Sequence, residues 1–205
     1  MNLGQIRSLI KKKFDNKLDG KFSDSYIDDL INEALKEFLE ETLLLEATDS
    51  SLTYSSLNDG FVLPSDFIQV KYVEWTFNSG YTRELESTTI SEIKRRRNVW
   101  AIDNESADRD ALNPSAYTIH NGHLILDTYT QTSPKLYYYK YDSTLSNDTD
   151  SPSIPTRFHK YLADYVCFEL DPNKQKCIAR WQMGLQLARN RKQKTEGFRT
   201  KYIGL

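Results

Sequence analysis

Cysteine is scarce in this sequence, since Cys167 and Cys177 are its only two among 205 residues. The two cysteines are ten residues apart and could form a disulfide, but we expect a pair of buried thiols in a reducing compartment. The sequence also lacks an apolar run of about 18 residues and the core of a signal peptide. We therefore expect no membrane-spanning helix, and a protein that is kept in the cytoplasm or built into something assembled there.

The sequence motifs of catalysis are missing as well. There is no glycine-rich phosphate loop, GxSxG elbow, HExxH motif or CxxC pair. His120 and His123 flank an Asn-Gly turn and would face each other, but a zinc site needs a third and usually a fourth ligand. His159 suits packing or capping in the first turn of a helix, and Cys167 has no evident base that would activate a nucleophile. We expect no enzymatic activity, no cofactor and no metal.

The charge balance argues against uniform attraction to nucleic acid. Lysine and arginine total 27 against 29 acidic residues, which gives a net charge of -2. Two segments are locally basic: residues 94–97 are four consecutive cations, and residues 180–201 hold seven cations against one acid. Cations are favoured at a helix C-terminus, so a solvated helix end is the simpler interpretation of residues 94–97. A DNA-binding module that uses both basic segments is the alternative.

Helical periodicity marks both ends of the chain. Residues 2–18 and 24–46 carry apolar stripes at helical spacing, and the second has acids on its opposite face. Pro155 begins a further helix, because its missing N–H costs nothing at the first helical position. We expect the stripe of residues 158–165 to pack on the stripe of residues 30–38. A turn after residue 170 then leads into a last helix that pairs with it.

The middle of the chain has the alternation of β-strands. Residues 67–77 and 135–141 alternate between two faces, and Asn121-Gly122 between two alternating runs is the signal of a type I′ hairpin. A short helix near 89–98 is capped by threonine, and the acidic residues 98–114 suggest an irregular loop.

The sequence therefore predicts an α+β fold. Its N-terminal and C-terminal helices form an antiparallel helical bundle, with an inserted antiparallel β module. The expected divisions are 1–50 for the first helices, 51–145 for the β-rich module, 146–196 for the last helices and 197–205 for an extended tail.

Thirteen tyrosines crowd the sequence, many of them on the predicted strands. Tyrosine combines an apolar face with a polar tip, which suits protein interfaces as well as packing on a sheet. Bases also stack on tyrosine, but such platforms are basic. Here the acidic loop 142–150 follows the tyrosine strand and would repel phosphates.

Several motifs occur in a fixed order. They are Leu63-Pro64-Ser65-Asp66-Phe67, the hairpin from Tyr117 to Leu126, the strand Leu136 to Tyr141, and Ile154-Pro155 before Phe158-His159. This order resembles the head-to-tail adaptor proteins of tailed bacteriophages, over nearly the whole chain. The resemblance implies a structural virion protein in the neck, assembled in the host cytoplasm. It would form a ring, usually of twelve copies, that joins the portal to the tail around the DNA channel.

The resemblance also implies the partners: the portal protein, a downstream tail or neck protein and further copies of this chain. DNA would pass without sequence-specific binding, and no membrane is involved. In that family the C-terminal segment commonly docks on the portal. The candidate docking residues here are Phe198, Arg199, Lys201, Tyr202, Ile203 and Leu205. A related tail-completion or stopper protein is a variant of the same hypothesis.

Contacts between copies in a ring join two different patches. Complementary charge suggests that acids of the second helix meet basic residues of the last helix. The residues concerned are Glu33, Glu37 and Glu40 on one side and Arg180, Arg189 and Arg191 on the other.

Overall fold

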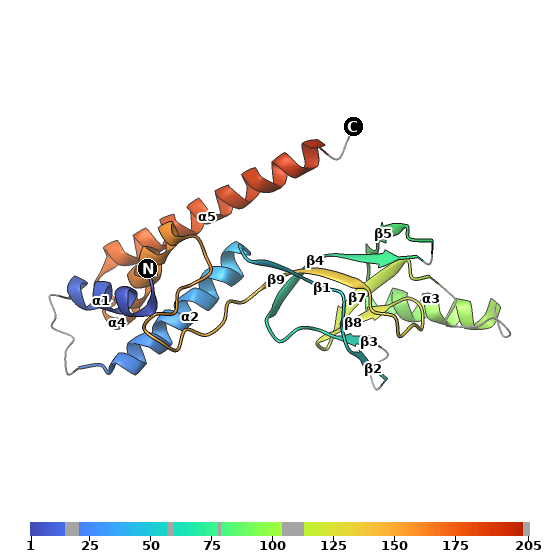
Figure 1. The fold of residues 1–205 in the computed structure, drawn as a ribbon, viewed down its shortest axis with the longest axis horizontal. Helices are drawn as coiled ribbons and strands as arrows, with labels where there is room; N and C mark the ends of the chain where they lie inside the picture. Colours follow the sequence, from blue (N-terminus) through green and yellow to red (C-terminus); the bar gives the residue numbers. More distant parts are fainter. Residues whose placement is uncertain (15–20, 57–59, 78, 104–112, 203–205) are drawn as a thin grey trace. The chain divides into compact units, whose positions relative to one another are not determined.

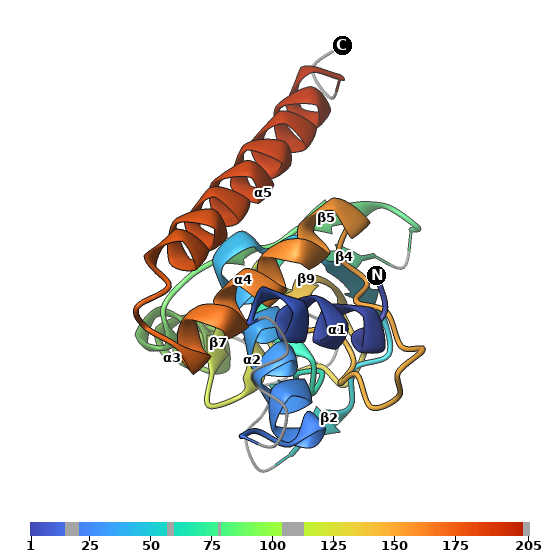
Figure 2. The same cartoon turned by 90° about the vertical axis from the view of Figure 1, so that its left-hand side faces the viewer.

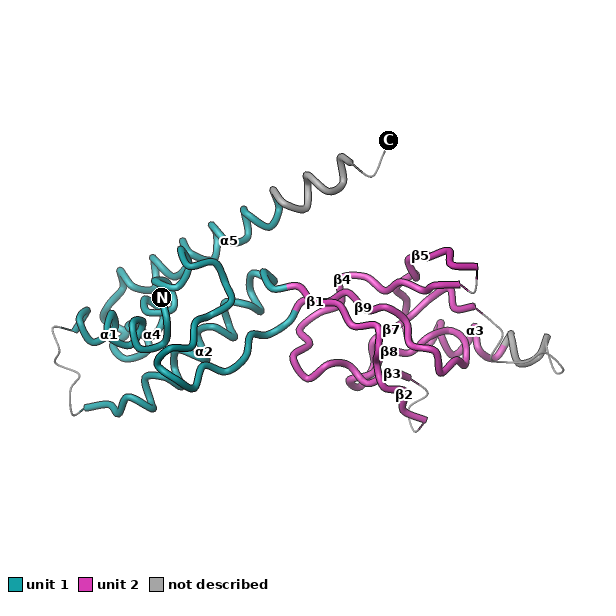
Figure 3. The backbone as a smooth tube through the Cα atoms, viewed as in Figure 1, with its two compact units in different colours: residues 1–45, 140–205 teal, residues 46–139 magenta. Residues whose placement is uncertain are grey.

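A computed structural model describes residues 1–14, 21–56, 60–77, 79–103 and 113–202 (Figure 1). For residues 99–103 and 194–202 it describes the backbone alone. The chain divides into two compact units (Figure 3). Unit 1 consists of Met1–Leu45 with Lys140–Leu205, and unit 2 of Glu46–Tyr139. Unit 2 is therefore inserted in sequence between two parts of unit 1.

Unit 1 is helical. Its elements are α1 (Leu3–Lys13), α2 (Asp24–Thr42), the 3-10 turn η2 (Thr156–Phe158), α4 (His159–Leu170) and α5 (Gln175–Tyr202). Local capping explains two starts: the side chain of Asn2 accepts from Gln5 N in a capping box, and that of Ser23 accepts from Tyr26 N. Pro155 precedes η2, which leads directly into α4.

The core of unit 1 joins helices from both ends of the chain. The ring of Phe38 on α2 lies 5.6 Å from that of Phe158 and 5.5 Å from that of Trp181, measured between centroids. The expected packing of the stripe at 158–165 on the stripe at 30–38 is thereby confirmed. Figure 2 views unit 1 with α1 in front, lying across α2 and α4.

Unit 2 contains two sheets. The first has the strand order β1 (Glu46–Asp49), β9 (Lys135–Lys140), β4 (Phe67–Thr76), β5 (Thr82–Glu84). The second has the order β2 (Tyr54–Ser55), β3 (Gly60–Val62), β8 (His123–Leu126), β7 (Ala116–His120), β6 (Glu86–Ser87). One buried cluster includes residues of both sheets, among them Val73, Trp75, Leu124, Leu136 and Tyr138.

The predicted hairpin is confirmed. His120 pairs with His123 across the turn, and Asn121 and Gly122 both have positive φ, of 47° and 75°. A type I′ turn needs left-handed backbone at both positions, which asparagine and glycine tolerate.

One strand pair departs from the expected antiparallel module. β6 runs parallel to β7, and α3 (Ile90–Asp103) connects them. Parallel neighbours need a crossover connection, and the helix between residues 90 and 103 supplies it. The α+β class is thus confirmed, with two mostly antiparallel sheets.

Three boundaries also differ from the expectations. α2 ends at Thr42 because Leu43 has left-handed backbone, with φ 49° and ψ 47°, and Glu46 then begins a strand. α3 continues to Asp103, so the backbone of 98–103 is helical, whereas 104–112 lie outside the described residues. α5 continues through Gly197 to Tyr202, where an extended tail was expected. One glycine costs a helix only about 1 kcal/mol, and the surrounding Lys, Gln and Arg residues are good helix formers.

Candidate functional site

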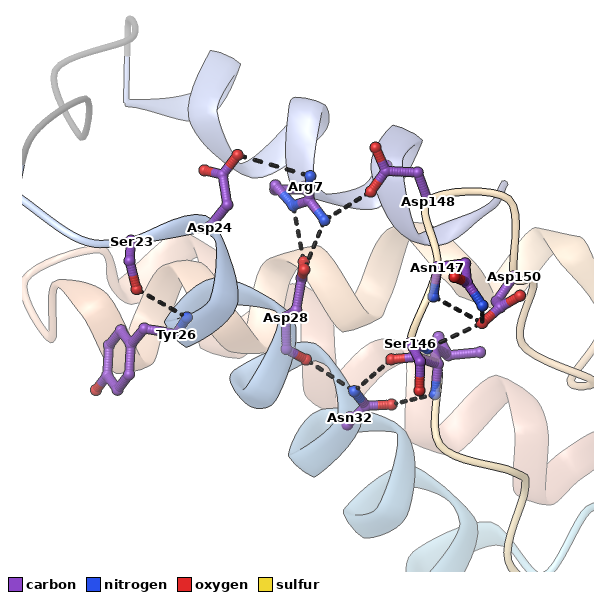
Figure 4. Close-up of polar contacts among 12 residues, drawn as sticks. Arg7, Ser23, Asp24, Tyr26, Asp28, Asn32, Ser146, Asn147, Asp148 and Asp150 are labelled. Atoms are coloured by element: carbon purple, nitrogen blue, oxygen red, sulfur yellow. Dashed lines mark hydrogen bonds and ion pairs between the residues drawn. The ribbon is translucent and has the colours of Figure 1, made fainter.

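Residues 142–155, which include the acidic loop expected at 142–150, form a strap fastened to the N-terminal helices (Figure 4). Leu3 N donates to Asp150 O at 2.8 Å, and Gly4 N donates to Asp148 O at 3.1 Å. A Cβ on Gly4 would lie 3.3 Å from Cβ of Asp148, so the strap and α1 approach closely at this point. The first turn of α1 thus uses its unpaired N–H groups to hold the strap.

Arg7 is the centre of the polar contacts between α1, α2 and the strap. Its Nε and Nη2 donate to the two carboxylate oxygens of Asp28 at 2.7 and 2.5 Å, and Nη2 also donates to Asp148 at 2.8 Å. The Asp28 bond is the main cause that raises the pKa of Arg7. Beside it, Lys11 Nζ lies 2.7 Å from Asp24 and lowers the pKa of that carboxyl group. The forked pair of Arg7 and Asp28 fixes the orientation of the two side chains as well as neutralising their charges.

Further along, Asn32 of α2 pairs with the strap backbone. Its amide donates to Leu145 O at 3.1 Å, and its carbonyl oxygen accepts from Leu145 N at 2.8 Å. Asp150 accepts from the backbone N–H groups of Asn147 and Ser146, which lower its pKa. The strap carboxylates therefore serve the fold, a role that the sequence interpretation of a repulsive acidic loop missed.

A groove lies between α2 and the start of the strap. Its volume is about 310 Å³, and we call it the α2 groove; it is lined by Asn32, Glu33, Leu35, Lys36, Leu39, Tyr141, Asp142, Ser143 and Thr144. Lys36 Nζ lies 5.3 Å from the centroid of the Tyr141 ring. The Tyr141 hydroxyl donates to Glu40, which raises the pKa of that tyrosine to about 12. The wall is thus part apolar and part charged.

The six residues predicted for contacts between copies have different surroundings. Glu40 binds Tyr141, and Glu37 binds the hydroxyl of Tyr165, whose pKa is raised by burial and by this bond. Glu33 is exposed and lines the α2 groove.

The predicted basic residues lie on α5. Arg189 donates from Nε to the backbone oxygen of Glu41 at 3.0 Å and also pairs with the Glu41 carboxylate. Arg180 lies 3.8 Å from the buried Asp164, yet 59% of its side chain is exposed. Arg191 is exposed. Arg189 thus already joins α5 to α2 within one chain.

The predicted docking residues are only partly described. The backbone of α5 includes Phe198, Arg199, Lys201 and Tyr202, but their side chains lie outside the description. Ile203 and Leu205 lie outside the described residues altogether.

Three arginines in the basic run of α3 have local partners. Arg95 and Arg96 both bind Glu92, at 2.7 and 3.0 Å, and Arg96 also reaches Glu86 at 3.1 Å. The hydrogen bonds from Arg95, which has the larger effect, and from Arg96 lower the pKa of Glu92 to about 2. Arg97 Nε donates to Leu126 O at 2.9 Å and joins α3 to β8. The spacing of Glu92 three and four residues before arginines was a readable signal for this arrangement.

Reactive groups do not gather in the described part of the chain. Cys167 and Cys177 are both buried thiols, and burial raises the pKa of Cys167 to about 12. Such a thiol is protonated at neutral pH and is a poor nucleophile. Within the described ranges no three His, Cys, Asp or Glu side chains are placed to hold a metal ion. Likewise, no described helix is both long and apolar enough to cross a membrane.

The comparison with known protein families covers both units. The family model described as SU10 adaptor protein matches residues 1–200. No curated protein matches the sequence at a significant level. The family match extends from α1 into the last turns of α5, and it confirms the resemblance to bacteriophage adaptors that the motif order suggested. The chain therefore belongs to the SU10 adaptor protein family, a family of structural phage proteins.

Proposed function

We propose that this chain is the head-to-tail adaptor subunit that joins the portal to the tail. In this proposal the helices of unit 1 are the antiparallel bundle, unit 2 is its inserted β module, and copies assemble in the host cytoplasm into a ring, usually of twelve, around the DNA channel. The observation that carries the proposal is the family match over residues 1–200. The variant in which the chain is a tail-completion or stopper protein rests on the same match.

The length of α5 supports docking of its C-terminal end. The buried residues that pack it on unit 1 are Cys177, Trp181, Gly184 and Ala188, and none of residues 189–193 is buried. The helix nevertheless continues to Tyr202. Since most helical stability in proteins comes from packing an apolar face, a partner surface would stabilise these last turns. The portal is the partner that we propose, with residues 198–205 as the contact.

A truncation tests this role. Deleting Gly197–Leu205 should abolish co-purification with the portal, while the far-UV circular dichroism keeps the helical signal of the rest of the chain. The matched control is Gln193→Ala, a small change on an exposed part of the same helix. Portal binding that survives the truncation would overturn the docking role of this segment.

Pairing within the chain weakens the case for the first of the two segments of the DNA-binding alternative. Arg95, Arg96 and Arg97 bind Glu92, Glu86 and Leu126 of the same unit. The segment 180–201 retains its local positive charge. A gel-shift assay with duplex DNA at low salt separates the two functions, because phosphate-driven binding is strongest there. We expect no shift.

A further inference from the structure

The outer face of α5 carries an exposed apolar ridge. Met183 and Leu187 are each 48% exposed and are four positions apart, so they lie on one face of the helix. Ala179, also exposed, extends the ridge by one turn. Exposed apolar side chains grouped on one helix face indicate an interaction surface more strongly than scattered ones do.

The charge around this ridge has one sign. Residues 175–193 contain no acid, and Arg180 and Arg191 are exposed on either side of Met183 and Leu187 along the helix. A surface that fits the ridge must therefore offer an apolar wall bordered by acids.

The α2 groove has this composition. Leu35 and Leu39 lie at its floor but are only 3% and 0% exposed, so the half-buried ring of Tyr141 supplies its accessible apolar surface. Glu33 and Asp142 supply carboxylates at its border. Lys36 is the one cation among its lining residues, and its ammonium group lies over the Tyr141 ring. The groove therefore complements the ridge in apolar character and, with two acids against one cation, in charge.

A chain cannot place its own ridge in its own groove. The face of α5 that contains Trp181 and Gly184 packs inside unit 1, where α5 contacts Phe38 and Glu41 of α2. The groove instead lies where α2 meets Tyr141 and the first residues of the strap, 142–144. The ridge points out of the helix packing, so a fit requires a second copy.

We infer that the α5 ridge of one copy binds the α2 groove of the next copy. Met183 and Leu187 contact the Tyr141 ring in the groove, while arginines of α5 approach Glu33. The contact joins two different patches, so it repeats from copy to copy and closes into a ring or extends into a filament. This inference rests on the proposed function and specifies the subunit contact of its ring.

Two single substitutions test the contact from its two sides. Leu187→Asp places a carboxylate in the ridge, and Glu33→Arg replaces the acid at the groove with a bulky cation. Each should weaken self-association by at least about tenfold, as expected when a central interface residue is lost. Gln182→Asp adds the same charge to an exposed site of α5 away from the ridge and should leave association unchanged. Mass photometry of the purified chain, alone and on the portal, measures the species formed.

Mixing the two variants gives the sharper result. Leu187→Asp keeps an intact groove and Glu33→Arg keeps an intact ridge, so one such pair can form and must stop at two subunits. Neither variant alone should pass beyond a monomer. If each variant by itself still forms rings like those of the wild-type chain, the proposed contact is wrong, whereas the adaptor function is unaffected. A wild-type chain that binds no portal and forms no oligomer would overturn the proposed function as well.

Discussion

Gly184 determines how closely α5 packs on α4, and Gly184→Ala should loosen that packing. A Cβ at this position would lie 2.5 Å from Cγ, 2.7 Å from Cδ2 and 3.0 Å from Cβ of Tyr161. These atoms form the base of a ring that is itself buried, so they cannot swing aside. The two helices would have to separate.

Two opposing effects give the magnitude. Alanine stabilises a helix interior by about 1 kcal/mol relative to glycine. An added methyl group in a tightly packed core costs about 1–3 kcal/mol, and a contact as short as 2.5 Å belongs at the upper end. We therefore expect Gly184→Ala to lower the free energy of unfolding of unit 1 by about 2 kcal/mol. Urea denaturation followed by circular dichroism at a helical wavelength measures this change.

A double mutant separates the clash from other effects. In a Tyr161→Ala background the contacts with Cγ and Cδ2 are gone and only the 3.0 Å contact with Cβ remains, so Gly184→Ala should lose most of its destabilising effect. The effect of Gly184→Ala should thus differ between the two backgrounds by at least about 1 kcal/mol. If Gly184→Ala stabilises the otherwise wild-type chain, the close approach of α5 to α4 is not what limits this position.

Three further changes test other parts of unit 1. Arg7→Met leaves the partly buried Asp28 without its forked partner and should cost about 2 kcal/mol in urea denaturation, whereas Asp148→Asn, at a side chain 70% exposed, should cost under about 1 kcal/mol; equal losses would contradict the central role of Arg7. Leu43→Ile preserves volume but places a β-branched residue in left-handed backbone, so it should lower the free energy of unfolding by about 1 kcal/mol, with Leu43→Asn as the tolerated control. The pKa of Asp24 is lower in the folded chain than its ordinary value of 3.8. Its contribution to stability is therefore present above that value and is lost as the pH falls through the folded pKa. The urea concentration at the unfolding midpoint should decrease as the pH is lowered below about 4, and it should decrease less steeply in Asp24→Asn.

Much of the secondary structure follows from local sequence. Asn121-Gly122 predicts its hairpin because the turn needs residues that tolerate positive φ, and the structure has both. Pro155 predicts the restart of the helices, which begins at Thr156. The apolar stripes of α2 and α4 predict the buried faces on which Phe38 and Phe158 meet.

The candidate site was less accessible to prediction. The acidic face of α2 was recognised, but the α2 groove also needs Tyr141 and Asp142, which are more than a hundred residues away in the sequence. For the cations at 94–97 a solvated helix end was the simpler interpretation and DNA binding the alternative, whereas Arg96 and Arg97 have partners, Glu86 and Leu126, on separate strands. The roles of the groove residues and of the α3 arginines depend on residues far away in the sequence, so they become visible only in the tertiary structure.

The sequence by itself determined where the helices lie to within their ends, where the hairpin turns and which helix faces are apolar, because these depend on neighbours within a few positions. Tertiary structure decided which faces meet and at what distance. Arg7 joins residues 21 and 141 positions away, and Gly184 is constrained only because Tyr161 lies against it. Periodicity identifies the face that a helix buries but not its partner, and close contacts depend on both.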